Sequence, residues 1–100
     1  MQNSPNSPGG TEKYHFMLFV SGMSVKSVNA LENLRRICDK YLPGQFEIQI
    51  IDISKEKDQA VKYQIIAIPT LIKTAPNHPR TILGDLSDTE KVLKILDINV

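Results

Sequence analysis

The nine residues Ile65-Ile66-Ala67-Ile68-Pro69-Thr70-Leu71-Ile72-Lys73 decide the fold of this chain. Their β-branched side chains favour a strand, but Pro69 cannot donate a ladder hydrogen bond. An X-Pro bond adopts the cis form at modest free-energy cost, so a cis Ile68-Pro69 bond is one interpretation. A trans proline at a strand start or bulge is the other. Either way, Pro69 marks where the strand begins.

The next segments toward the C-terminus predict a hairpin and a helix. The turn-rich Ala75-Pro76-Asn77-His78-Pro79 separates the first strand from a second short one at Thr81–Leu83. Ser87-Asp88-Thr89-Glu90 then has the spacing of a capping box. We therefore expect a helix from Ser87 to about Asp97, with Ser87 as its N-cap and Glu90 reaching back.

The segments toward the N-terminus predict a strand, a helix and a second strand. Tyr14–Ser21 is too continuously apolar for a one-sided strand, which favours a central strand buried on both faces and ended by Gly22. Ser24 is a plausible N-cap for a helix that runs until Pro43-Gly44. Phe46–Ile53 returns to a strand pattern. A connection of this length favours a right-handed crossover and parallel pairing.

A short polar helix is predicted between the two pairs of strands. Ser54 can cap it, and it would extend from about Lys55 to Tyr63. Ala60 and Val61 give it only a small apolar face. The full order is then βαβαββα with a proline entering the third strand, which is the arrangement of a thioredoxin-like α/β fold.

Composition limits the function classes. The first twelve residues, MQNSPNSPGGTE, are predicted to be a disordered tail, and residues 13–100 a single domain. The formal charge is +1 without a dense basic cluster, so nucleic acid is not an expected partner. The longest strongly apolar run, Phe16–Val20, is far shorter than the roughly 20 residues that span a bilayer. With no secretory signal visible, we expect no membrane partner and a cytoplasmic location.

Candidate catalytic and metal-binding residues are few. A dithiol oxidoreductase needs a cysteine pair at a helix N-terminus, but residues 22–27 contain no cysteine. The single cysteine, Cys38, is in helical register with Leu31, Leu34 and Leu42, which predicts a buried structural thiol. Ser24 is read as a cap, and neither it nor Ser27 has a local activating partner. We therefore expect no catalytic residues, no cofactor and no enzyme activity.

The two histidines carry no metal motif. His15 lies within a strand and His78 within a turn, and neither has a Cys or His at ligand spacing. Gly84-Asp85 could form a phosphate-binding corner before the last helix, but Asp85, Asp88 and Glu90 already supply negative charge there. Gly84 is therefore read as a backbone requirement.

The C-terminal residues have conflicting local preferences. Leu96-Asp97-Ile98-Asn99-Val100 alternates apolar and polar residues with a strand period, directly behind a helical start. One interpretation is a helix end whose apolar residues dock on the core. The other is a segment that can convert to a second fold.

Several motifs resemble those of the KaiB family. Ile68-Pro69-Thr70-Leu71 is followed twelve residues after Leu71 by Leu83-Gly84-Asp85-Leu86-Ser87, and then by Glu90-Lys91-Val92-Leu93. Leu18–Gly22, Ser27-Val28 with Ala30-Leu31, and Ile51-Asp52-Ile53 also look like KaiB segments, so the resemblance covers about residues 14–96.

The resemblance implies a non-catalytic regulator that binds a KaiC-type hexameric ATPase and, in clock systems, helps to sequester a KaiA-type activator. It also implies two possible arrangements: a thioredoxin-like fold, and a KaiB-specific fold with a rearranged C-terminal half. A homo-oligomer, dimer or tetramer, is expected. The candidate partner-binding or fold-motif residues are Gly22, Ser27, Pro69, Thr70, Gly84, Asp85, Leu86 and Ser87.

Two departures favour a paralogue outside the standard oscillator, with a role in timing or in stress adaptation. Asn29 stands where clock KaiB proteins usually have a basic residue, and Tyr63-Gln64 where they tend to have Asp-Lys. Two alternatives stay open: a thioredoxin-superfamily redox protein that lacks the dithiol, and a stand-alone sensory adaptor for a histidine kinase.

Overall fold

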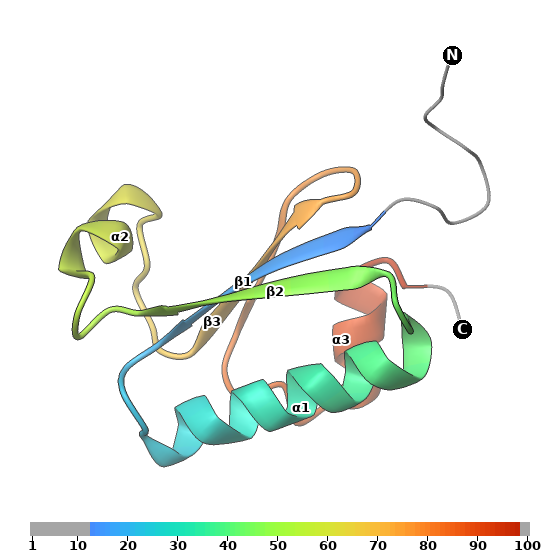
Figure 1. Ribbon diagram of the computed structural model, residues 1–100, viewed down its shortest axis with the longest axis horizontal. Helices are drawn as coiled ribbons and strands as arrows, with labels where there is room; N and C mark the ends of the chain where they lie inside the picture. The colour runs from blue at the N-terminus through green and yellow to red at the C-terminus, as the bar shows by residue number, and fades with distance from the viewer. Residues whose placement is uncertain (1–12, 99–100) are drawn as a thin grey trace.

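Figure 1 shows the computed structural model of the chain, which describes residues 13–98. The elements are β1 (Tyr14–Val20), α1 (Val25–Tyr41), β2 (Phe46–Asp52), α2 (Lys57–Lys62), β3 (Thr70–Ala75), β4 (Arg80–Leu83) and α3 (Thr89–Ile95). The predicted order βαβαββα is confirmed. The tail predicted at residues 1–12 lies outside the described residues.

The four strands form one mixed sheet in the order β2-β1-β3-β4. β1 pairs in parallel with β2, as the crossover prediction requires, and antiparallel with β3. β3 and β4 form the predicted antiparallel hairpin. Every residue of β1 from Phe16 to Val20 is buried, which confirms that this strand is central and covered on both faces.

Two apolar clusters lie on opposite faces of the sheet. The larger one joins β1, β3 and β4 to α1 and α3 and includes Phe16, Leu34 and Leu71. Figure 1 shows both of these helices on the same side of the sheet. On the other face, Met17, Phe19 and Ile51 are covered by the segment that follows α2. Among the described residues, this second cluster contains none from α1 or α3.

Local signals account for the bounds of α1. The Ser24 hydroxyl accepts a hydrogen bond from the N–H of Ser27 at 3.3 Å, so Ser24 is the N-cap, as predicted. The helix ends at Tyr41, with Leu42 as C-cap, directly before Pro43. Proline is disfavoured within a helix because its ring clashes with the preceding turn.

The N-cap predicted for α2 is wrong. Ser54 donates its hydroxyl to Oδ1 of Asp52 at 2.6 Å, and the helix begins only at Lys57, after Glu56. Because the Ser54 side chain is bonded to the strand end, it does not cap the helix. The predicted shallow burial is confirmed, since α2 contains no buried residue.

The capping box predicted for α3 is also wrong. Asp88 caps the helix by accepting from the N–H of Lys91 at 3.2 Å. The N–H of Ser87 instead donates to Oδ1 of Asp85, at 3.2 Å, which forms a side-chain turn before the helix. The N-cap therefore lies one residue later than predicted.

The same helix ends at Ile95, earlier than the predicted Asp97. Asp97 has φ +59° and donates its N–H to the Lys94 carbonyl at 3.2 Å, and Ile98 donates to Leu93 at 2.9 Å. This pair of bonds is a Schellman motif. Leu96 and Ile98 are buried, which supports the helix-end interpretation for residues 96–98; Asn99 and Val100 lie outside the described residues.

Candidate functional site

The candidate site lies at the end of the sheet where β1 finishes and β3 begins. The Ile68-Pro69 bond is cis, as one of the two interpretations required, and so is Ala75-Pro76, which the sequence did not single out. The Pro69 carbonyl accepts from the N–H of Gly84 at 2.9 Å, and Thr70 lies opposite Leu83. The structure therefore brings the predicted Pro69, Thr70 and Gly84 together.

Gly22 and Ser27 reach the same end from β1 and α1. The register pairs Phe19 with Thr70, so the loop after β1 lies near the start of β3. The Ser27 hydroxyl, which is buried, accepts from the N–H of Ser21 at 3.2 Å and from the hydroxyl of Ser24 at 2.8 Å. Ser27 therefore holds the loop in place and is not offered to a partner.

Asp52 fixes this loop from the neighbouring strand. Its Oδ1 accepts from the N–H of Gly22 at 3.0 Å, and from both the N–H and the hydroxyl of Ser54. These bonds lower the pKa of Asp52 below its usual 3.8, with the Ser54 hydroxyl as the largest cause and the N–H of Gly22 next. Sequence reasoning quoted Asp52 only within a family motif. Its position at the carboxyl end of a strand parallel to β1 was the signal for this contact.

The corner before α3 contacts α1 and consists of Asp85, Leu86 and Ser87. Nδ2 of Asn33 donates to the Asp85 carbonyl at 2.8 Å. Leu86 has φ +65° and is buried in the large core cluster, whereas Ser87 is exposed. Of the predicted site residues, Ser27, Pro69, Thr70 and Leu86 are buried and shape the fold.

An exposed apolar patch adjoins this end of the sheet, and sequence reasoning missed it. Ile66 is 87% exposed and Leu83 is 54% exposed. Both line a hollow of about 400 Å³ on the face of the sheet without α1 and α3. We call Ile66, Leu83 and the neighbouring Tyr63 the Ile66 patch. The strong β pattern of residues 65–73 hid it, because Ile66 lies before Pro69 and outside the strand.

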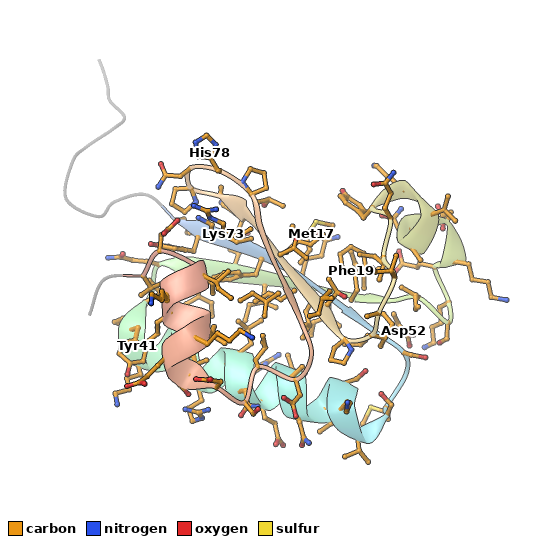
Figure 2. The ribbon with its side chains drawn as sticks, turned by 180° about the vertical axis from the view of Figure 1, so that it is seen from behind. Met17, Phe19, Tyr41, Asp52, Lys73 and His78 are labelled. Atoms are coloured by element: carbon orange, nitrogen blue, oxygen red, sulfur yellow. The ribbon has the colours of Figure 1, made fainter. Side chains whose placement is uncertain are left out.

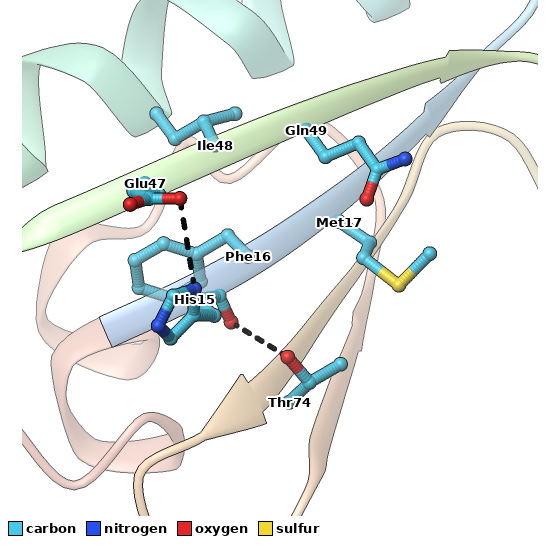
Figure 3. A pocket seen from close by; sticks show the side chains of 7 residues that line it. All are labelled: His15, Phe16, Met17, Glu47, Ile48, Gln49 and Thr74. Carbon is cyan, nitrogen blue, oxygen red and sulfur yellow. Dashed lines mark hydrogen bonds and ion pairs between the residues drawn. The ribbon is translucent and has the colours of Figure 1, made fainter. Parts of the chain in front are cut away.

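Two further depressions flank the sheet. On the face of the sheet without α1 and α3, a hollow of about 210 Å³ is surrounded by His15, Met17, Gln49 and Thr74. In this hollow, Nδ1 of His15 lies 3.9 Å from the Glu47 carboxylate (Figure 3). Between α1 and β2 is a larger groove of about 590 Å³. Its apolar lining includes Met23, Val28, Leu31 and Ile50.

The arrangement offers little for catalysis within residues 13–98. Cys38 is buried, and burial, with a smaller contribution from Asp39, raises the pKa of its thiol to about 12. Such a thiol carries almost no thiolate at neutral pH. Figure 2 shows His78 at the hairpin tip and Asp52 at the opposite end of the molecule. The described part of the chain contains no cluster of three or more His, Cys, Asp or Glu side chains that could hold a metal ion.

None of the helices described between residues 13 and 98 has the length and apolar character that crossing a membrane requires.

Lys73 is the unexpected polar residue of the interior. Its side chain is fully buried, and Nζ donates to the Pro76 carbonyl at 2.8 Å. Lys73 lies two residues after the buried Leu71 in β3. Alternate residues of a strand point to the same face, and this spacing was the signal that Lys73 points to the core side.

Solved structures with similar folds include thioredoxins and the N-terminal domain of a protein named SasA. The N-terminal domain of Synechococcus elongatus SasA matches with a TM-score of 0.73 at 18% identity, covering 99% of this chain and 95% of that one. Chloroplastic thioredoxin z matches with a TM-score of 0.72 at 13% identity, covering 87% and 79%. At these identities the comparison shows the fold alone, and it confirms the predicted thioredoxin-like class.

Sequence relatives are closer. The circadian clock protein KaiB3 of Synechocystis is 43% identical over 81 residues, which is 81% of this chain and 79% of the relative. The circadian clock oscillator protein KaiB of Microcystis aeruginosa is 41% identical over 85 residues, covering 85% and 82%. The family model described as the KaiB domain matches residues 17–98. By this match and these identities, the chain belongs to the KaiB family.

Proposed function

We propose that this protein is a non-catalytic regulator that binds a KaiC-type ATPase in the cytoplasm, in circadian timing or stress adaptation. The observation that carries the proposal is the KaiB-domain match over residues 17–98, together with relatives that are named circadian clock proteins. The buried thiol of Cys38 argues against the redox alternative. KaiA-type or histidine kinase partners are secondary candidates, and the groove between α1 and β2 is the surface open to them.

The Ile66 patch is the surface we assign to the ATPase. Ile66 and Leu83 are 87% and 54% exposed, and apolar side chains that are exposed side by side often mark protein interfaces. The patch is positioned by the predicted site residues, since Pro69 and Gly84 join the strands at its base. Lys62, stacked over the Tyr63 ring at 5.4 Å, adds a positive charge at its margin.

The decisive experiment mixes this protein with the KaiC-type ATPase of its own host, with and without ATP, and measures complex formation by size-exclusion chromatography. We expect a complex in at least one condition, and Ile66→Lys should abolish it. Ile50→Lys places the same charge on β2 and should retain binding. Absence of a complex in both conditions would overturn the proposal, and retention by Ile66→Lys would overturn the assigned surface.

A further inference from the structure

A small cluster of side chains that can bind a metal ion lies on the face of the sheet without α1 and α3. His15 and Met17 are two residues apart in β1, so both point to the same face. In the parallel register Glu47 of β2 lies opposite His15, and Gln49 lies opposite Met17. All four line the same hollow of about 210 Å³ (Figure 3). Strand pairing therefore brings a nitrogen, a sulfur and a carboxylate oxygen to one place.

The spacing of these side chains suits a single ion. A strand rises about 3.3 Å per residue, so His15 and Met17 are about 6.6 Å apart along β1, a span that an imidazole and a thioether bridge through one ion. Nδ1 of His15 lies 3.9 Å from Oε1 of Glu47, which is too long for a hydrogen bond. Two ligand atoms that each lie about 2 Å from one ion are up to about 4 Å apart. An ion therefore fits between Nδ1 and Oε1.

The charges around the hollow favour an ion with a single positive charge. Oε2 of Glu47 pairs with Nζ of Lys13 at 3.2 Å, which leaves Oε1 on the side of His15. The Lys13 ammonium balances the Glu47 carboxylate, so the cluster has no excess negative charge to attract a divalent ion. Coulomb repulsion from Lys13 is half as large for a monovalent ion as for a divalent one. Ions such as Zn(II) are therefore disfavoured.

We propose that His15 and Met17 bind a copper(I) ion, with the Glu47 carboxylate completing the site. A thioether is a soft ligand that selects Cu(I), and imidazole also suits copper. Met17 is buried and packs with Phe19 and Ile51, whereas the side chains of His15 and Glu47 are partly exposed. The ion is thereby held between a buried sulfur and two donors that reach solvent, through which it enters the site.

The chain supplies a matched control for each soft donor. It contains two histidines, three methionines and one cysteine. Figure 2 shows His78 at the hairpin tip, and Met23 is exposed in the loop that follows β1. Cys38 is buried within the large core cluster. None of these three side chains lines the hollow, so each separates binding at the proposed site from binding elsewhere.

The first test measures Cu(I) affinity by competition with bicinchoninate, under ascorbate and without oxygen. We expect one equivalent of Cu(I) per chain. Loss of a group outside the ligand set typically costs about 10–100-fold in metal affinity, so His15→Gln and Met17→Leu should each cost at least about tenfold. Met17→Leu nearly conserves volume and keeps the fold. His78→Gln and Met23→Leu should retain the affinity. Wild-type protein that binds no Cu(I), or a His15→Gln variant that binds it equally tightly, would overturn the proposal.

The second test locates the ion, with Ag(I) as a probe of the same charge that keeps its oxidation state. Backbone amide NMR spectra of the full chain are recorded during an Ag(I) titration. Signals from residues 15–17 and 47–49 should shift, whereas those of Met23 and His78 should not. The Cys38→Ala variant should show the same shifts as wild type. Shifts centred on Cys38 or on the hairpin tip would overturn the assigned site.

Zinc separates a copper site from a general imidazole–carboxylate pair. Zn(II) binds imidazole and carboxylate groups, but its protein ligands do not include thioethers. Met17→Leu should therefore weaken Cu(I) binding and leave Zn(II) binding unchanged, whereas Glu47→Gln should weaken both. Equal losses for the two ions in Met17→Leu would contradict Met17 as a ligand. All these measurements use the protein alone, so their outcome is independent of the proposed function.

Discussion

The N–H of Gly22 donates to Oδ1 of Asp52 at 3.0 Å, joining the loop after β1 to the end of β2. The same oxygen accepts the hydroxyl of Ser54 at 2.6 Å. One carboxylate thus fixes the loop that contains Gly22, 30 residues before it in the sequence, and the loop that contains Ser54. The charge on Asp52 therefore contributes to the shape of this end of the sheet.

Removing the Ser54 hydroxyl should raise the pKa of Asp52. That hydroxyl is the largest cause of the lowered pKa, so Ser54→Ala should move the value back toward 3.8. Because the folded-state pKa is lowered, Asp52 stabilises the fold above its unfolded pKa, and this contribution is lost as pH falls through the folded value. Carboxyl NMR titration of both proteins checks the shift. An unchanged Asp52 titration would contradict the assigned hydrogen bond.

Gly84 should tolerate alanine less well than Gly44. Gly84 has φ +103°, whereas Gly44 has φ +71°, closer to the left-handed helical region that other residues visit. Space is open around both positions, so the difference is one of backbone conformation. We expect Gly84→Ala to lower the free energy of unfolding by about 2 kcal/mol, and Gly44→Ala by about 1 kcal/mol. Urea unfolding measures both, and equal losses would contradict this account.

Local signals explain why most elements were predictable. Ser24 and Pro43 mark the ends of α1, and Pro69 marks the start of β3, because caps and prolines act on their immediate neighbours. The errors came where a polar residue near a helix start had a competitor. The hydroxyl of Ser54 donates to Asp52. The backbone N–H of Ser87 donates to Asp85, and Asp88 caps α3 in its place. Single-sequence patterns do not rank such competitors.

The candidate site was less predictable than the fold. Pro69 and Gly84 were identified as motif residues, yet their mutual hydrogen bond depends on the β3–β4 register. The Ile66 patch and the hollow beside His15 depend on sheet order and on what covers each face. Those properties arise from contacts between distant segments, which periodicity within one segment does not encode.

Cys38 should resist thiol reagents in the folded protein. With a pKa of about 12, only about one thiol in ten thousand is ionised at pH 8, against about one in ten for an ordinary thiol with a pKa of 9.0. We expect labelling by a disulfide reagent at pH 8 to be at least a thousandfold slower in the native state than in guanidinium chloride. Native labelling at the unfolded rate would contradict the buried placement and reopen the redox alternative.

Lys73 should give the protein a distinct alkaline stability profile. Burial lowers its pKa from 10.5, an effect that Asp97 partly offsets and Arg80 reinforces. A lowered lysine pKa means that the charged form is disfavoured in the folded state. The resulting penalty is present at neutral pH and is relieved as pH rises from the folded value toward 10.5, because the folded protein then binds fewer protons than the unfolded chain.

Replacing Lys73 with methionine isolates this effect. Lys73→Met loses the hydrogen bond to the Pro76 carbonyl, and it also removes the charge from the core. The free energy of unfolding of the variant minus that of wild type should therefore be larger at pH 7 than at pH 10. Urea unfolding of both proteins at both pH values measures this difference. Lys94→Met, at an exposed position in the last turn of α3, should show no such change. If the difference between Lys73→Met and wild type is the same at both pH values, the buried amine carries no penalty and Lys73 is solvated in solution.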